Sequence, residues 1–175
     1  MNILLVSARF LPHRGGLENV VKHLAEELAR NGHAVRIITN RYPRYLKRRE
    51  VIDGIQVDRL YFLLPEKIHF HDGRFDLWLA GLWFRVWTKW QLRRLIKEFK
   101  PDVINNHYLN EVAEFTGKCL KGKENNIPWV ISLHGGDVDG EPLQDETKRM
   151  RFVRLSRQAD RLTACSQFLA NQAIA

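Results

Sequence analysis

Residues 2–39, NILLVSARFLPHRGGLENVVKHLAEELARNGHAVRIIT, decide the fold. Residues 2–7 form an apolar run with the length of a buried strand, and residues 35–39 form a second one. Between them, residues 17–31 carry apolar side chains at helical spacing. Asn31-Gly32 ends that helix, because glycine suits its left-handed cap position. The stretch therefore predicts a strand–helix–strand unit, the building block of a parallel sheet.

The rest of the chain continues this alternation. A basic stretch at residues 41–49 is expected to be a loop, Asp53-Gly54 is a turn signal, and Ser166 is placed as the N-cap of a last helix. Strand patterns follow at residues 55–62, 103–107, 128–133 and 161–165, and helical patterns at residues 75–99, 111–121 and 146–158. We predict a single α/β domain over residues 1–175, Rossmann-like, with a mostly parallel sheet covered by helices on both faces.

Composition excludes several classes of protein. The 175 residues suffice for one domain, and 45% hydrophobic with 27% charged residues excludes a disordered or collagen-like chain. No apolar run approaches the roughly 20 residues of a transmembrane helix, and the start lacks a signal-peptide pattern. Cys119 and Cys165 form neither a disulfide framework nor a metal knuckle, so we expect a cytoplasmic protein.

The polar residues just after the strands are the candidate site residues, because ligands bind outside the carboxyl ends of an open parallel sheet. Gly15-Gly16 follows the first strand and precedes a helix, whose free N–H groups favour a phosphate. The same pair also fits a plain strand-to-helix turn. The pattern is not G-x-G-x-x-G and no Walker lysine follows, which disfavours a dinucleotide fold or a P-loop.

His134 is the first polar side chain after the apolar run at residues 128–133. A histidine there either donates a hydrogen bond to a sugar hydroxyl or phosphate, or acts in proton transfer, or only hydrogen-bonds a loop. Asp137 either orients His134, binds a hydroxyl or caps a turn. His69 and His71 have no third ligand at a suitable spacing, so we expect loop histidines and no metal site.

Residues 75–99 are unusually rich in aromatic side chains, with tryptophan at 78, 83, 87 and 90. One interpretation is a crossover helix whose apolar side faces the core and whose basic end is solvated. The other is a helix lying partly in a membrane interface, with aromatic rings at headgroup depth and cations on anionic lipid. The residues assigned to that lipid contact are Trp78, Trp83, Trp87, Arg93 and Arg94.

The net charge of +8 admits nucleic acid, an anionic membrane surface or a phosphorylated ligand. The basic loop at residues 41–49 carries Tyr42 and Tyr45, and arginine with interleaved aromatic residues can bind single-stranded nucleic acid. No recognised nucleic-acid module surrounds it, so we expect no nucleic-acid partner.

Several short motifs occur in the order of a known family. The whole chain resembles the amino-terminal domain of a family-four retaining glycosyltransferase with the GT-B fold. The quotable pieces are NILLV at residues 2–6, PHRGGLE at 12–18 (similar to P-x-x-G-G-x-E), LAEELARNGHAV at 24–35, PDVI at 101–104, VISLHGGD at 130–137 and ADRLTACS at 159–166.

The resemblance implies transfer of a sugar from a nucleotide-sugar to a sugar or lipid-linked acceptor, with retention at the anomeric carbon. Gly15 and Gly16 would approach the donor phosphate or the transferred sugar, and His134 would be the catalytic residue beside the reacting sugar. Asp137 and Glu18 would be acceptor-binding or second-rank site residues. Asn105 stands where the family often has the first histidine of H-x-H, so His107 is placed with the secondary residues.

The resemblance covers one half of the family's architecture, the acceptor-side half. The carboxy-terminal half, which holds most of the nucleotide-sugar through basic residues and a glutamate pair, is not represented in residues 1–175. We therefore expect no turnover without such a domain in cis or on a partner chain. No cofactor is expected beyond the nucleotide-sugar donor. The alternative is a non-enzymatic, basic, tryptophan-rich α/β module that docks on an anionic membrane, on its cytoplasmic face, or on a partner protein.

Overall fold

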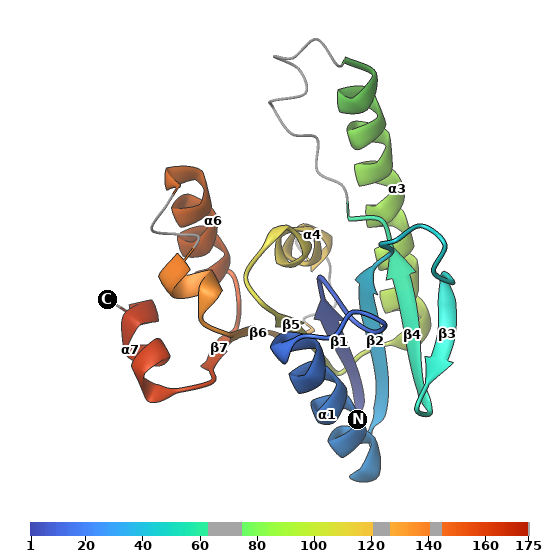
Figure 1. Cartoon of the computed structure of the whole chain (residues 1–175), viewed down its shortest axis with the longest axis horizontal. Coiled ribbons are helices and arrows are strands. Elements are labelled where there is room, and N and C mark those ends of the chain that lie inside the picture. Colours follow the sequence, from blue (N-terminus) through green and yellow to red (C-terminus); the bar gives the residue numbers. More distant parts are fainter. Residues whose placement is uncertain (63–74, 121–126, 141–144, 175) are drawn as a thin grey trace.

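The computed structural model describes residues 1–62, 75–120, 127–140 and 145–174. Within these residues seven strands form one sheet in the order β3-β4-β2-β1-β5-β6-β7 (Figure 1). The strands are β1 (Asn2–Ser7), β2 (Ala34–Asn40), β3 (Arg49–Ile52), β4 (Ile55–Leu60), β5 (Val103–His107), β6 (Trp129–Leu133) and β7 (Arg161–Ala164). The helices are α1 (Gly16–Arg30), α3 (Phe75–Phe99), α4 (Glu111–Leu120), α6 (Glu146–Ser156) and α7 (Gln167–Ile174), with a π-helical turn, η1, at Gly136–Gly140.

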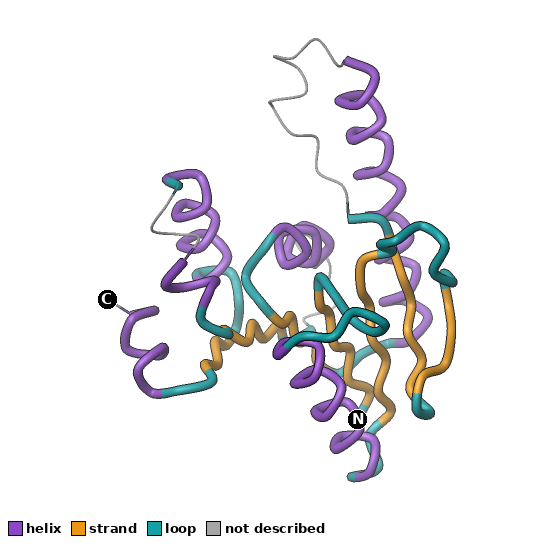
Figure 2. The backbone as a smooth tube through the Cα atoms, in the orientation of Figure 1, coloured by secondary structure: helices purple, strands orange, loops and turns teal. Residues whose placement is uncertain are grey.

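Helices cover both faces of the sheet (Figure 2), which confirms the expected α/β architecture. Successive residues of β1 point to opposite faces, as in any strand. Ile3 and Leu5 pack under α1 with Val21, whereas Leu4 and Val6 pack on the other side. That second core contains buried residues of α3, α4, α6 and α7, and Leu92 of α3 is completely buried in it.

The edge of the sheet differs from the sequence prediction. Residues up to 49 are expected there as a loop, but the structure forms a β3–β4 hairpin in which Ile52 pairs with Ile55 in antiparallel fashion. Asp53 and Gly54 form its two-residue turn with φ of 49° and 80°. Two positive φ values are what a hairpin turn that follows strand twist requires. The remaining strand pairings are parallel.

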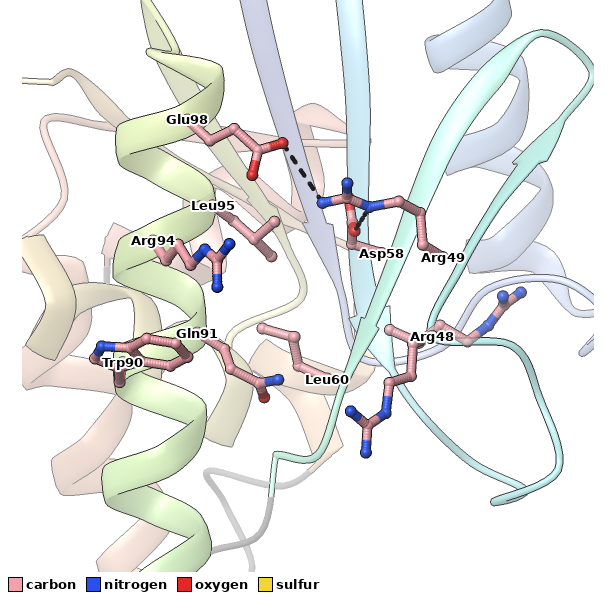
Figure 3. Close-up of a pocket in the computed structure, with 10 residues that line it drawn as sticks. Arg48, Arg49, Asp58, Leu60, Trp90, Gln91, Arg94, Leu95 and Glu98 are labelled. Carbon is pink, nitrogen blue, oxygen red and sulfur yellow. Dashed lines mark hydrogen bonds and ion pairs between the residues drawn. The ribbon is translucent and has the colours of Figure 1, made fainter.

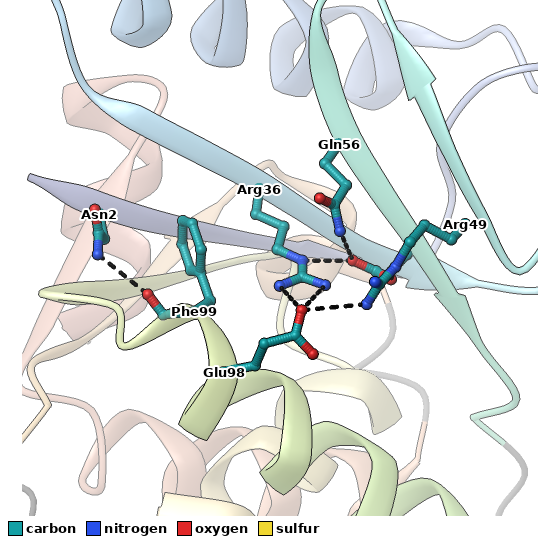
Figure 4. Close-up of polar contacts among 7 residues, drawn as sticks. Asn2, Arg36, Arg49, Gln56, Glu98 and Phe99 are labelled. Carbon is teal, nitrogen blue, oxygen red and sulfur yellow. Dashed lines mark hydrogen bonds and ion pairs between the residues drawn. The ribbon is translucent and has the colours of Figure 1, made fainter.

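A buried ionic cluster holds α3 against the sheet (Figure 4). Arg36 of β2 donates through Nε to Asp58 of β4 at 2.5 Å and through both Nη atoms to Glu98 of α3 at 3.2 and 3.3 Å. Arg49 of β3 donates to the second oxygen of Asp58 at 2.8 Å. The Arg36 and Asp58 side chains are each only 5% exposed. The cluster therefore joins three strands and the long helix through a buried pair, Arg36 and Asp58, flanked by the half-exposed Arg49 and Glu98.

The order of the strands reverses at the centre of the sheet. From β1 the chain proceeds to β2 on one side, whereas β5 and the strands after it continue on the other side. Ser7 at the end of β1 lies in register with His107 at the end of β5. Ligands of open α/β sheets bind at such a switch point, beyond the carboxyl ends of the two strands. The loops that follow β1, β5 and β6 are therefore the place to look for a site.

Candidate active site

Two histidines meet at the switch point. His107 is the last residue of β5, and His134 directly follows β6. The two strands pair in parallel with His107 beside Ser132, so the chain brings His134 next to His107. His107 Nδ1 lies 3.2 Å from His134 Nε2, within hydrogen-bond distance. The register of two neighbouring strands thus creates a contact between residues 27 positions apart in sequence.

Asp137 connects the two histidine loops through backbone hydrogen bonds. Its Oδ1 accepts the N–H of His134 at 2.9 Å and of Gly135 at 3.0 Å, and its Oδ2 accepts the N–H of Leu109 at 3.0 Å. The residue is 1% exposed. Of the three roles open from sequence, orienting the His134 loop is the one that these contacts support. A carboxylate held by several N–H donors fixes the loops that it bridges.

Glycine residues leave room in the His134 loop. Gly135 has φ of 109°, which side chains other than glycine rarely adopt. A Cβ on Gly136 would lie 2.7 Å from the hydroxyl oxygen of Tyr108, so the absence of a side chain lets the tyrosine approach. Tyr108 itself has φ of 76° and follows His107. The loops after β5 and β6 are thus tightly fitted to one another around the histidine pair.

The surroundings keep both histidines neutral at physiological pH. Burial, together with the neighbouring His134, lowers the pKa of His107 from 6.5 to about 4. Burial also lowers the pKa of His134, although the carboxylate of Asp137 acts in the opposite direction. Between two neutral rings, one nitrogen donates a proton to the other. Perturbed histidines of this kind at a sheet's switch point are typical of functional sites.

The lowered pKa of His107 predicts a stability that falls in acid. As the pH drops from 6.5 toward 4 the unfolded chain takes up a proton at this residue before the folded chain does. Stability is therefore complete above pH 6.5 and decreases by about 3 kcal/mol on the way to pH 4. Urea unfolding at a series of pH values measures this slope. His107→Gln should flatten it and the exposed His23→Gln should not; equal slopes in both variants would contradict the assignment.

The loop after β1 that contains Gly15, which we call the glycine loop, lies at the same edge of the sheet. Gly15 is the N-cap of α1, and a Cβ on Gly15 would overlap the carboxylate of Glu18. Nothing lies within 4 Å of a Cβ built on Gly16, so the first turn of α1 is open there. Glu18 is 7% exposed. No hydrogen bond among the described residues joins this group to the histidine pair, so the structure forms two clusters at one edge.

The glycine loop is anchored by residues that the sequence pattern did not single out. Arg59 of β4, which is 2% exposed, donates to the carbonyl of Leu11 at 2.5 Å and pairs with Glu50 of β3. His13 Nε2 lies 2.9 Å from the carbonyl oxygen of Tyr42, and the two rings stack. An arginine inside a strand was the available signal, because a buried charge needs partners from other elements.

The aromatic helix has two sides. Trp83, Trp87 and Arg94 are exposed, whereas Arg93 is partly buried and its Nε lacks a hydrogen-bond partner among the described residues. The side chain of Trp78, and all of His69 and His71, lie outside the described residues. In the described part of the chain no three histidine, cysteine, aspartate or glutamate side chains gather as a metal site would require. No helix described there is long and apolar enough to cross a bilayer.

Several solved structures share this fold. Sucrose-phosphate synthase from Thermosynechococcus elongatus matches with 20% identity and a TM-score of 0.64, over 91% of this chain and 41% of that one. The α,α-trehalose-phosphate synthase (UDP-forming) from Burkholderia xenovorans, in complex with glucose-6-phosphate, matches with 13% identity and a TM-score of 0.62, over 99% and 42%. MurG from Acinetobacter baumannii matches with 16% identity and a TM-score of 0.58, over 95% and 42%.

These likenesses establish the fold, and they show that the chain spans less than half the length of these three proteins. Among curated proteins no sequence matches significantly. The family model for Glycosyltransferase Family 4 matches residues 14–175. Because that match covers the chain from the glycine loop to its last residue, the protein belongs to Glycosyltransferase Family 4, with the Rossmann-like fold seen in GT-B glycosyltransferases.

Proposed function

We propose that this chain is the acceptor-side half of a retaining glycosyltransferase, which moves a sugar from a nucleotide-sugar to an acceptor hydroxyl. The histidine pair at the switch point carries the proposal, together with the family assignment. The chain's match to less than half of each of those proteins supports a division of labour with a second domain. That domain would bind most of the nucleotide-sugar, in cis or on a partner chain.

His134 is the proposed catalytic residue, acting as a neutral hydrogen-bond donor beside the transferred sugar. Its Nε2 faces His107, and its Nδ1 makes no hydrogen bond to any residue that the structure describes. The ring is half-buried, so it is accessible from the site. A fixed donor at the point where charge develops lowers the barrier without reorganising at the moment of reaction.

His107 is the proposed positioning residue that selects the tautomer of His134. The Nε2 atom of His107 is buried and without a partner among the described residues. Buried N–H groups without partners are rarer in proteins than under-satisfied acceptors, which favours a bare Nε2 and a proton on Nδ1. His107 then donates to Nε2 of His134, and the proton of the neutral His134 ring sits on Nδ1, ready to donate to the sugar.

Gly15 and Gly16 are proposed to receive the donor phosphate or the transferred sugar. The open space at Gly16 and the free N–H groups of the first turn of α1 favour a negatively charged group there. The Glu18 carboxylate lies on the inner side of Gly15, which restricts how closely an anion can come on that side. Glu18 and Asp137 thus shape the site, and the proposal gives neither of them a proton-transfer step.

The proposal is tested by reconstitution. The purified chain, with and without a carboxy-terminal nucleotide-sugar domain, is incubated with a panel of nucleotide-sugars, and nucleoside diphosphate release is measured. We expect release only when that domain is present. Comparing the anomeric configuration of donor and product by NMR then tests retention. Robust turnover by the 175-residue chain alone would overturn the two-part assignment, and an inverted product would overturn the proposed stereochemistry.

A further inference from the structure

One side of α3 carries aromatic side chains that do not pack in the hydrophobic core. Trp83, Trp87, Trp90 and Arg94 follow one another at i, i+4, i+7 and i+11, which places them along one side of the helix. The indoles stack with ring centroids 5.7 Å apart for Trp83 and Trp87 and 5.1 Å apart for Trp87 and Trp90. The guanidinium of Arg94 lies 5.6 Å from the centroid of the Trp90 ring. We call these four residues the tryptophan stripe.

The three indoles of the stripe are exposed although each carries a large apolar surface. Trp83 is 62% exposed and Trp90 50%, and Val86 beside them is 71% exposed. The opposite side of the same helix provides the core contact through residues such as Leu92 and Ile96. Core packing therefore accounts for the apolar residues on one side of α3, and not for the tryptophans on the other side. A contiguous exposed apolar patch on a protein surface usually marks a contact.

The stripe leads directly into a basic cavity of about 220 Å³ between α3 and the β3–β4 edge (Figure 3). At one end, Arg49 pairs with Asp58 and Glu98. Arg94 on α3 and Arg48 on the opposite wall, next to β3, make no ion pair with any described residue. Trp90 lines the same cavity. The Arg94 guanidinium against the Trp90 indole sets a cation beside an apolar surface, which suits a phosphate attached to an apolar body.

The shape of the molecule presents the stripe outward. In Figure 1 α3 continues past the ends at which β1, β2 and β4 stop, so its first half stands clear of the sheet. The tryptophans lie toward that projecting part, and Arg94 and the exposed Lys97 follow them along the helix. Indoles with cations at their margin match the chemistry of a bilayer surface, where aromatic rings sit at headgroup depth and cations meet lipid phosphates.

We propose that the tryptophan stripe docks this protein peripherally on an anionic phospholipid bilayer. The three indoles enter the headgroup region, and the cavity lined by Arg48, Trp90 and Arg94 takes a lipid phosphate. Positive charge beside the indoles complements an anionic surface, and this complementarity selects a lipid bilayer over an uncharged apolar partner. The proposal goes beyond glycosyl transfer, and its test does not depend on enzymatic activity.

Vesicle flotation tests the docking. The purified protein is mixed with vesicles of phosphatidylglycerol and phosphatidylcholine, or of phosphatidylcholine alone, at low and high salt. We expect binding to the anionic vesicles, weakened by salt, with a blue shift of tryptophan emission as exposed indoles leave water. Trp129 is 3% exposed, so its contribution to the tryptophan emission should stay constant on binding. Absence of binding to anionic vesicles at low salt would overturn the proposal.

Matched variants locate the contact. Trp83→Ser with Trp87→Ser should weaken vesicle binding at least about tenfold, and Arg94→Gln about fivefold. The controls are Phe168→Ser, which removes a 68% exposed aromatic ring from α7, and Arg149→Gln, which removes an exposed arginine from α6. Both controls should bind as the unchanged protein does. If stripe and control variants lose binding equally, the proposal fails.

The competing occupant of the stripe is a second copy of this chain. Light scattering across a range of protein concentrations, without lipid, separates the two. Concentration-dependent dimers that disappear in the Trp83→Ser, Trp87→Ser variant, together with no vesicle binding, would overturn the membrane assignment. Thermal unfolding followed by circular dichroism should give the same midpoint for each variant, because the replaced side chains are exposed.

Discussion

His134→Ala is expected to reduce kcat about 100- to 1000-fold when the protein is supplied with a nucleotide-sugar domain, as the proposed function requires. The proposed Nδ1–H of His134 would hydrogen-bond the reacting sugar, and an alanine leaves that position without a donor. Neither the fold nor the Asp137 bridge depends on the ring, since Asp137 binds the backbone N–H of residue 134. Steady-state kinetics with a nucleotide-sugar measures the loss, and donor affinity should change much less than kcat.

Two comparisons make this result specific. His134→Asn keeps an N–H donor and should retain more activity than alanine, whereas exposed His23→Ala on α1 should behave as the unchanged enzyme. Because burial lowers the pKa of His134 below 6.5, its ring stays neutral and the rate should not decline between pH 8.5 and 7.5. Full activity in His134→Ala would remove the residue from the mechanism, while the family assignment would stand.

Asp58→Asn is expected to lower the free energy of unfolding by about 3–5 kcal/mol. Asp58 lies between two guanidinium groups, at 2.5 Å from Arg36 Nε and 2.8 Å from Arg49 Nε. Removing its charge leaves the 5% exposed Arg36 with only Glu98, whose side chain is 46% exposed. The cost of a buried, partly unpaired charge exceeds that of an ordinary lost hydrogen bond. Urea unfolding at neutral pH measures it.

Glu98→Gln provides the matched control, because it removes a carboxylate from the same cluster at a half-exposed position. That loss should be about 1 kcal/mol or less. Replacing both buried partners, in Arg36→Met with Asp58→Leu, should recover much of the stability lost in Asp58→Asn, since no buried charge then lacks its partner. A loss below 1 kcal/mol in Asp58→Asn would show that the cluster contributes little to stability.

Residues 2–39 were sufficient to predict the class of fold because their information is local. Apolar runs, helical spacing and the glycine after Asn31 each act within a few residues. The edge strand β3 escaped prediction although Asp53-Gly54 is the strongest two-residue hairpin signal, because the charged residues before it resemble a loop. In the sequence, Arg36 and Asp58 likewise resemble exposed surface residues. Only the fold brings them together as a buried ion pair.

The sheet topology made it possible to predict at which edge of the sheet the candidate site lies. His134 and Asp137 follow a strand, so their edge of the sheet could be inferred. The contact between His107 and His134 depends on the register of β5 against β6, which no local pattern specifies. The resemblance to the family places His107 among the secondary residues, and the structure brings its ring within hydrogen-bond distance of His134. Their roles in catalysis stay predictions.

If the proposed acceptor-side function holds, the carboxylate of Asp137 decides which segments can be changed to alter acceptor specificity. Because it holds Leu109 and His134 by their backbones, the segments after β5 and β6 behave as one rigid body. A graft or insertion in either segment would displace both. The glycine loop after β1 and the segment after β2 join each other through His13 and the Tyr42 carbonyl, and the donors to Asp137 come from the segments after β5 and β6. Directed evolution of new acceptors should therefore accept changes in this second pair of segments far more readily.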